Sequence, residues 1–360
     1  MKRVHNFSAG PATLPLEVLQ KAQSELVDYQ GTGTSIMEKS HRGPEYTKVD
    51  AEARERLSRI LGLGDDFEIM FLQGGASTQF FSIPFNFLGK NETADYINTG
   101  TWSKKAIKEA KLFGTIHEAF SSADSNFNRV PTSNELNLSS DARYVHFTSN
   151  NTIFGTQFLT EPETNGVPLV CDASSDFLSR PIDVSKYGMI YSGAQKNLGP
   201  AGVTVVIIRK DFLSSANKSD IPTMVNYKTH AEGAMFNTPP TFAVYMVNLV
   251  LEWIEDHGGL NYFNKLSQTK SGLLYSVIDA DGFYRGTTEK ASRSNMNVCF
   301  RLGSEELEAE FLKEAATHDL VALKGHRSVG GVRASIYNAC PVTSVQALAD
   351  FMKEFKAKKG

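Results

Sequence analysis

From about residue 68 to residue 210 the sequence alternates short apolar runs with amphipathic stretches, and this alternation limits the fold more than any other feature. The runs are rich in β-branched and aromatic side chains and include IMFL, YVHFT, PLVCD, MIYSG and VTVVIIR. Such runs separated by helices are typical of an α/β domain, with a mostly parallel central sheet and helices on both faces. We therefore expect ligands to bind beyond the carboxyl ends of these strands.

A chain of 360 residues is long enough for two domains. We expect an N-terminal segment over 1–15, a large α/β domain over 16–259 and a smaller C-terminal α+β domain over 260–360. The change of pattern after a Gly-Gly pair at 258–259 sets the second boundary. The smaller domain should contain the strands NVCFRL and VALKG and the helix SEELEAEFLKEAATH.

Apolar residues at helical spacing predict further helices. They fall over about 15–29, 47–61, 241–257 and 344–355. Residues 242–254 form the most apolar stretch, which is too short to span a bilayer and contains Asn and Glu.

Composition excludes several classes of function. The 37 basic and 40 acidic side chains leave a net charge of -3, so nothing favours nucleic acid or an acidic membrane as a partner. The three cysteines, Cys171, Cys299 and Cys340, are far apart and lack metal-ligand spacing, so we expect neither disulfides nor a metal site. The N-terminus lacks a secretion-signal pattern. We expect a soluble cytoplasmic protein.

A carboxylate and a lysine each follow a predicted strand. Asp172 ends the run PLVCD, and Lys196 lies three residues after the end of MIYSG. Side chains at the carboxyl ends of adjacent strands face one crevice. A lysine amine and a carboxylate suit pyridoxal phosphate, which needs one to form a Schiff base and the other to keep its ring nitrogen protonated. Spacing alone leaves open that Asp172 is a helix cap or turn residue.

Anion-binding features occur elsewhere in the sequence. The segment LQGGASTQF places a Gly-Gly pair between a strand and a helix, where free backbone N–H groups bind anions, although it also suits an ordinary β/α turn. His41–Arg42, His326–Arg327 and Arg333 lie in or near glycine-containing loops. An arginine matches a carboxylate or phosphate with two parallel hydrogen bonds. The alternative for each cation is a solvated surface position.

Seven segments together resemble the phosphoserine aminotransferases, a family of class V aminotransferases with the type I fold of pyridoxal phosphate enzymes. The segments are NFSAGPATLP, SHRGPEY, GGASTQF, TGTWSKKAIKEA, SGAQKNLGPAG, MFNTPPTF and KGHRSVGGVRASIYNA. The resemblance runs from end to end. It implies reversible amino transfer from L-glutamate to 3-phosphohydroxypyruvate, giving O-phospho-L-serine and 2-oxoglutarate, in two half-reactions.

The resemblance also assigns roles around the cofactor. It implies that Lys196 forms the Schiff base and shuttles the proton, that Asp172 pairs with the pyridinium nitrogen, that Trp102 stacks on the ring and that Thr152 reaches its phenolic oxygen. The phosphate would be held by Ala76, Ser77 and Gln195, and by Asn237 and Thr238 of the neighbouring subunit. A homodimer with shared sites follows.

For the substrate, the resemblance assigns Arg333 to the α-carboxylate. The distal anion, a phosphate or a carboxylate in turn, would be received by His41, Arg42, His326 and Arg327. Two positions depart from many relatives. Ala9 stands where they have Ser, which leaves only backbone contact, and Ala76–Ser77 stands where others have Gly-Arg, which removes one cation near the cofactor phosphate.

Other functions stay open on the sequence. The runner-up is another class V aminotransferase of the alanine- or serine-glyoxylate type. A cysteine desulfurase would need a nucleophilic cysteine on a loop, and Cys340 is its only candidate. A silent scaffold protein would not need both Lys196 and Asp172. Relatives also act in pyridoxine biosynthesis as well as serine biosynthesis, and the sequence does not choose between serving one and both.

Overall fold

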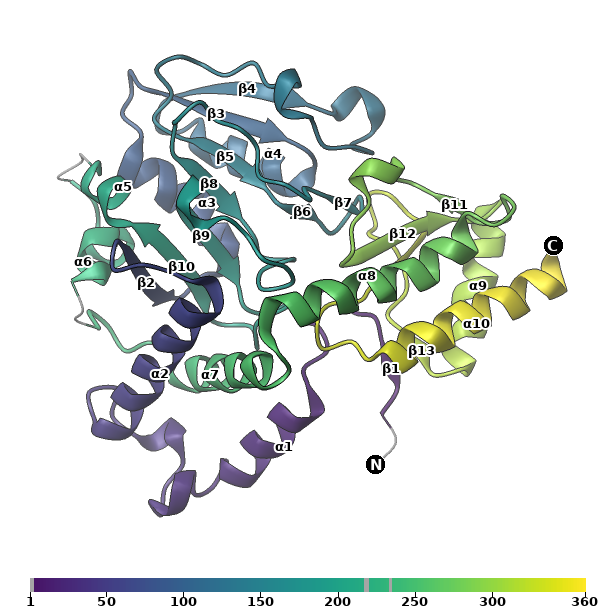
Figure 1. Ribbon diagram of the computed structural model, residues 1–360, viewed down its shortest axis with the longest axis horizontal. Coiled ribbons are helices and arrows are strands. Elements are labelled where there is room, and N and C mark those ends of the chain that lie inside the picture. Colours follow the sequence, from purple (N-terminus) through teal and green to yellow (C-terminus); the bar gives the residue numbers. More distant parts are fainter. Residues whose placement is uncertain (1–2, 217–219, 233–234) are drawn as a thin grey trace.

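The computed structural model describes residues 3–216, 220–232 and 235–360 and is built around a seven-stranded sheet (Figure 1). The strand order is β2-β10-β9-β8-β5-β3-β4. The bounds are β2 (Phe67–Leu72), β3 (Thr93–Asn98), β4 (Thr115–Ser121), β5 (Val145–Thr148), β8 (Leu169–Asp172), β9 (Tyr187–Gly193) and β10 (Thr204–Arg209). β10 is antiparallel to both neighbours, and the strands from β9 to β4 are parallel. The predicted mostly parallel α/β sheet is confirmed.

Helices cover both faces of this sheet, as predicted, because successive strand residues point to opposite sides. In β10, Val205 and Ile207 belong to one apolar core, while Val206 and Ile208 belong to the other. The first core is closed by α1 (Leu16–Glu25), α2 (Pro44–Leu61) and α7 (Thr241–Asp256). The second is closed by α3 (Gly75–Phe87), α4 (Thr101–Ala110), α5 (Lys210–Ser214) and α6 (Tyr227–Ala231).

The C-terminal part has its own antiparallel sheet and core. Its elements are α8 (Gly259–Ile278), β11 (Arg285–Gly286), β12 (Asn297–Arg301), α9 (Glu305–Thr317), β13 (Leu320–Val321), β14 (Val332–Ser335) and α10 (Val342–Lys359). The N-terminal strand β1 (His5–Asn6) pairs in parallel with β13, and Phe7 enters this core. We propose that the N-terminal segment and residues 260–360 together form the small domain.

Short elements complete the chain. A hairpin of β6 (Asn150–Asn151) and β7 (Thr156–Gln157) follows β5. The 3-10 turns are η1 (Tyr29–Gly31), η2 (Ile36–Glu38), η3 (Ala123–Ser125), η4 (Ser133–Glu135), η5 (Val184–Lys186), η6 (Thr223–Val225) and η7 (Lys290–Ser292). No helix among the described residues is both long and apolar enough to cross a bilayer.

Several helix boundaries differ from expectation, including that of α10, which runs from Val342 to Lys359 rather than over 344–355. α1 ends at Glu25 rather than near 29, because the chain turns into η1, where Gln30 takes a positive φ of 52°. α2 begins three residues early, since Pro44 suits a first helical position. α8 was not predicted. The Gly258–Gly259 pair does stop α7, but Gly258, at φ 93°, lets the chain turn and begin a second helix immediately.

A buried lysine fixes the loop after β14. Lys270 of α8 has no exposed surface, and its Nζ donates to the carbonyls of Tyr337 (2.6 Å), Asn338 (3.4 Å) and Cys340 (3.1 Å). Burial lowers the pKa of Lys270 to about 8, while Cys340 opposes the shift. The three hydrogen bonds offset the cost of burying the ammonium charge, so the loop is stabilised in the conformation that keeps all three carbonyls bound to it.

Lys270→Met should lower the free energy of unfolding by about 2–4 kcal/mol, because it keeps the apolar stem but leaves three carbonyls without their donor. Urea unfolding followed by circular dichroism measures the change. Lys265→Met, at an exposed position on the same helix, is the control and should stay within about 0.5 kcal/mol of the parent. An equally small change for Lys270→Met would contradict the stabilising role.

Candidate active site

Lys196 lies in the turn after β9, three residues beyond Gly193 at the end of that strand. Its Nζ is 5.2 Å from the centre of the Trp102 ring. Burial lowers the pKa of the amine to about 8; the Asp172 carboxylate opposes this shift and the Arg333 guanidinium adds to it. An amine with this pKa is partly unprotonated near neutral pH, which a nucleophile requires.

Asp172 is buried at the end of β8, beside Tyr191 of β9 in the sheet register. Ser174 donates to its Oδ1 from the backbone N (3.1 Å) and from Oγ (2.6 Å). Burial raises the pKa of Asp172, against the opposing effects of Lys196 and Ser174. Oδ2 accepts no hydrogen bond from the described residues. It is therefore free to accept one from a protonated ring nitrogen, so the carboxylate fits the predicted cofactor.

Three segments meet beside the lysine. Trp102, in the first turn of α4, donates from Nε1 to Thr152 Oγ1 at 3.0 Å. Arg333 of β14 donates from Nη1 to the Thr152 carbonyl at 3.1 Å. Lys105, one helical turn after Trp102, places its Nζ 4.5 Å from the same indole ring. The structure thus brings an aromatic face, a hydroxyl and two further cations close to Lys196.

The predicted His326–Arg327 pair lies in the loop between β13 and β14. Burial lowers the pKa of His326. Three cations near it, Arg333, Arg327 and Lys105, lower that pKa further. His326 and Arg327 therefore lie near Arg333 and Lys105. An anion bound among these side chains would reduce the repulsion between their positive charges.

The N-terminal segment passes directly over the lysine. The Ala9 carbonyl accepts a hydrogen bond from Tyr337 Oη at 2.8 Å, which ties this segment to the loop after β14. Gly10 has a φ of 145°, and a Cβ there would lie 3.3 Å from Cγ of Lys196. A larger residue would press on the lysine stem, which explains glycine at this position.

The predicted phosphate site lies at the start of α3. Ala76 and Ser77 are in its first turn, and the N-cap residue, Gly74, has no side chain that could cap the helix. Gly74 has a φ of 94°, and a Cβ on it would collide with Thr78 Oγ1. The backbone N–H groups of this turn are therefore available to an anion, with the Ser77 hydroxyl beside them. Gln195 directly precedes the site lysine in the chain.

Two predicted pairs are not brought to this group within one chain. His41 and Arg42 lie in the turn before α2, and no hydrogen bond or ion pair among the described residues joins either to the lysine or to Arg333. Asn237 and Thr238 lie in the segment before α7. The Thr238 carbonyl accepts a hydrogen bond from the Gln73 side chain at 3.2 Å. Figure 1 shows α2 at the left of the molecule and the small sheet at the right.

Three residues beside the site, Ser174, Lys105 and Gly10, were not predicted from the sequence. Ser174 follows the strand-ending aspartate by two positions, from which a backbone N–H and a hydroxyl can return to the carboxylate. Lys105 follows Trp102 by one helical turn, which places both on one helix face. Both signals could have been recognised. Gly10 gave no signal, because its role depends on a contact between segments far apart in the chain.

The chain is similar to known proteins over its whole length. The family model for class V aminotransferases matches residues 4–348. The phosphoserine aminotransferase of Niallia circulans is 54% identical, covering 100% of this chain and 99% of the relative, and that of Herpetosiphon aurantiacus is 54% identical, covering 99% of each.

Solved structures agree with these sequence matches. The phosphoserine aminotransferase from Bacillus circulans subsp. alkalophilus superposes with a TM-score of 0.98 at 53% identity, covering 100% of both chains. The pyridoxal-phosphate-bound phosphoserine aminotransferase from Trichomonas vaginalis superposes with a TM-score of 0.93 at 41% identity, covering 98% of this chain and 100% of that one.

Because only the unprotonated amine attacks the cofactor aldehyde, the rate at which apoprotein is reconstituted with pyridoxal phosphate should follow the titration of Lys196. With a pKa of about 8, the rate should rise roughly tenfold from pH 7 to pH 9 and then level off. Stopped-flow absorbance measures it. In Asp172→Asn the rate should level off at lower pH, because the opposing carboxylate is gone. A rate that keeps climbing beyond pH 10 would contradict the lowered pKa.

Proposed function

We infer that this chain, which belongs to the class V aminotransferases, is a pyridoxal-phosphate-dependent phosphoserine aminotransferase. It transfers the amino group of L-glutamate reversibly to 3-phosphohydroxypyruvate and gives O-phospho-L-serine and 2-oxoglutarate. One observation carries this function: the Lys196 amine and the Asp172 carboxylate lie beside a group of cations. Such a site anchors the cofactor and selects a substrate with two anionic ends.

The two central residues divide the work at the reacting carbon. When bound, pyridoxal phosphate supplies an electron sink that stabilises negative charge at the substrate Cα. We propose that Asp172, fixed by Ser174, keeps the ring nitrogen protonated through Oδ2. The Lys196 amine would anchor the cofactor and, once the substrate has displaced it, carry the proton between Cα and C4′. Trp102 would cover one face of the ring and exclude water.

The cofactor phosphate would be held by neutral donors. Ala76 and Ser77 offer the free N–H groups of the first turn of α3 and the serine hydroxyl, and Gln195 offers its side-chain amide. The positive end of the helix dipole favours a dianion at this position. Thr152 would reach the phenolic oxygen, because its Oγ1 accepts from Trp102 and still has a proton to donate.

The substrate would be held at both ends. Arg333 uses one Nη1–H for the Thr152 carbonyl and can direct its remaining donors to the α-carboxylate. His326 and Arg327 would receive the distal anion. Because burial and nearby cations lower the pKa of His326, it carries a proton more readily when an anion is bound than when the site is empty. Lys105 adds positive charge that tolerates either a phosphate or a carboxylate.

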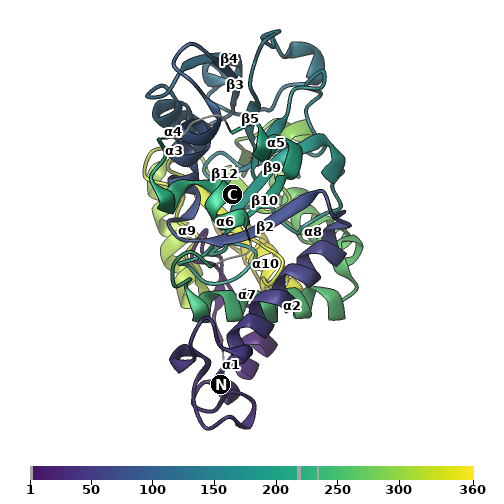
Figure 2. The same cartoon turned by 90° about the vertical axis from the view of Figure 1, so that its left-hand side faces the viewer.

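We propose that the site is completed by a second copy of the chain. Exposed apolar side chains occur in the segments that precede both pairs that do not reach Lys196 within one chain. Before His41–Arg42 they are Leu16, Leu19, Leu26, Val27 and Met37, and near Asn237–Thr238 they are Met224 and Phe236. Val27 is 82% exposed, and Figure 2 shows α1 and the turns after it projecting from the body of the molecule. A homodimer would cover these side chains and supply both pairs to the partner's site.

Further proposals follow from the same chemistry. The role is serine biosynthesis, and the pyridoxine-pathway substrate 3-hydroxy-2-oxo-4-phosphobutanoate is a second candidate because it also carries a distal phosphate. The three free cysteines suit the cytoplasm. Cys340 is buried, and burial raises the pKa of its thiol to about 11, so it lacks the exposed thiolate that a desulfurase needs.

Phosphoserine should convert the bound cofactor to its amine form at least about 100-fold faster per molar than serine, because serine has no distal anion for the cations to bind. Stopped-flow absorbance of the holoenzyme measures both rates. Arg327→Ala should lose most of this preference, while Arg285→Ala, an exposed arginine on β11, should keep it. Equal rates with serine would point instead to an aminotransferase of the alanine- or serine-glyoxylate type.

A further inference from the structure

The C-terminal halves of α2 and α7 pair in one constant register. Hydrogen bonds or ion pairs join Glu52 to Asn248, Arg56 to Glu252 and Arg59 to Glu255, and each pair is 196 positions apart in the sequence. Because the order of contacts is the same in both helices, they run in the same direction. Both helices therefore begin at the same end of the pair, α2 at Pro44 and α7 at Thr241.

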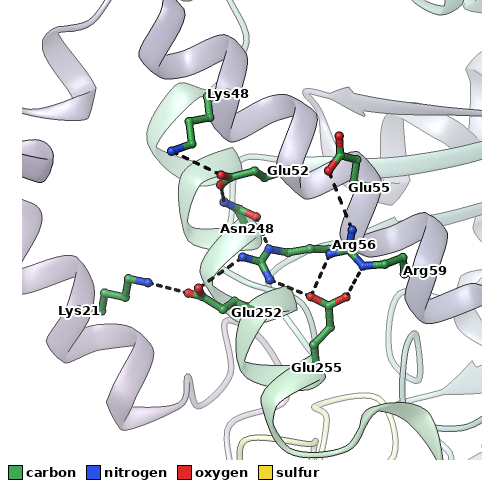
Figure 3. Close-up of polar contacts among 9 residues, drawn as sticks. All are labelled: Lys21, Lys48, Glu52, Glu55, Arg56, Arg59, Asn248, Glu252 and Glu255. Carbon is green, nitrogen blue, oxygen red and sulfur yellow. Dashed lines mark hydrogen bonds and ion pairs between the residues drawn. The ribbon is translucent and has the colours of Figure 1, made fainter.

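Two arginines of α2, Arg56 and Arg59, both donate to the carboxylate of Glu255 at the end of this pairing. Glu255 accepts from Arg56 Nη1 at 2.7 Å and from Arg59 Nε at 3.0 Å, so it joins two successive turns of α2 (Figure 3). Arg56 also donates to Asn248 at 3.1 Å and to Glu252 at 3.3 Å. One guanidinium thus contacts three side chains on one face of α7.

A third helix joins the same network. Lys21 of α1 donates to Glu252 Oε2 at 2.7 Å, and Glu252 thereby connects α1 to both other helices (Figure 3). The side chains of Arg56 and Glu255 are only 18% and 24% exposed. Burial alone would raise the pKa of Glu255, but hydrogen bonds from Arg59 and Arg56 hold it below the ordinary value. The network is therefore charged and partly desolvated, which favours defined geometry.

The segments before the two helices are the pairs assigned to the partner's site. Arg42 lies two residues before the start of α2, and Thr238 lies three residues before the start of α7. One pair is expected to receive the distal anion of the substrate and the other the cofactor phosphate. Apolar packing between two helices resists separation but tolerates small sliding, whereas the shared carboxylate of Glu255 fixes the register.

We propose that this α2–α7 network, Arg56, Arg59, Asn248, Glu252 and Glu255, is a positioning device that presents both pairs to the partner's site as one rigid unit. The proposal rests on the proposed homodimer with shared sites. Its residues touch neither substrate nor cofactor, so they act only through the segments that they hold. A change in the network of one chain should therefore be felt in the active site of the other chain.

Hybrid dimers of two differently tagged chains separate these effects. In the first hybrid, Lys196→Ala and Glu255→Gln are in the same chain, so the one working site belongs to the unmodified chain but receives its pairs from the altered network. In the second hybrid, Lys196→Ala and Glu255→Gln are in different chains, so the working site receives its pairs from an intact network. Both are purified as holoenzyme with pyridoxal phosphate.

The first hybrid should show a KM for 3-phosphohydroxypyruvate about fivefold higher than the second, with kcat changed less than twofold, and should release pyridoxal phosphate about fivefold faster on dilution. The second hybrid should match a hybrid of Lys196→Ala with unmodified chain. The proposal would be overturned if the two hybrids had equal KM values and equal rates of cofactor release, or if the second hybrid had the higher KM and the faster release. If Glu255→Gln does not fold, Glu252→Gln takes its place. Because it removes fewer contacts, the first hybrid should again have the higher KM, but the two KM values should differ less.

Two controls make the result specific. Glu314→Gln breaks an ion pair between α9 and α10 whose carboxylate is equally exposed, at 24%, and it should give equal values in both arrangements. Arg42→Ala in place of Glu255→Gln tests site sharing itself. If Arg42→Ala impairs only the site of its own chain, the shared homodimer site fails. If it impairs the partner's site while Glu255→Gln does not, only the network proposal fails.

Discussion

The attraction between the buried Asp172 carboxylate and the Lys196 amine is the interaction on which the site depends. Each group counteracts the desolvation of the other, since Asp172 raises the pKa of Lys196 and Lys196 lowers that of Asp172. Their approach requires β8 and β9 to pair as they do, because a slip of one residue would turn Asp172 to the other face of the sheet. The apolar cores on both faces hold that register.

The small domain is tied to the same turn by neutral hydrogen bonds. Asn197, the residue after Lys196, accepts from the backbone N of Asn338 at 2.9 Å, and Asn338 donates in turn to the Leu178 carbonyl at 2.9 Å. Asn338 lies five residues after Arg333, in the loop whose carbonyls accept hydrogen bonds from Lys270. Arg333 and Lys196 are therefore positioned relative to each other through a few buried polar contacts, which join the proposed small domain to the turn after β9.

Much of this arrangement could be predicted because it follows from patterns close together in the chain. Strand alternation indicated the sheet, and the positions of Asp172 and Lys196 near strand ends indicated two side chains that the structure places close enough to shift each other's pKa. Contacts between distant segments left no such signal: Gly10 against the lysine stem, Lys270 beneath the loop after β14, and the constant register of α2 on α7. The sequence also left open whether His41 and Arg42 serve the site of their own chain or that of a second copy, because a sequence does not say which subunit a loop serves.

The central claim is that position 196 carries the cofactor, and mapping the attachment tests it most directly. Borohydride reduction of the holoenzyme fixes the bound coenzyme to its lysine, and peptide mass spectrometry then locates the added pyridoxyl group. The account predicts one group per chain, on the peptide that contains Lys196. Attachment to Lys105, whose amine also lies against the Trp102 ring, or no attachment at all, would contradict it.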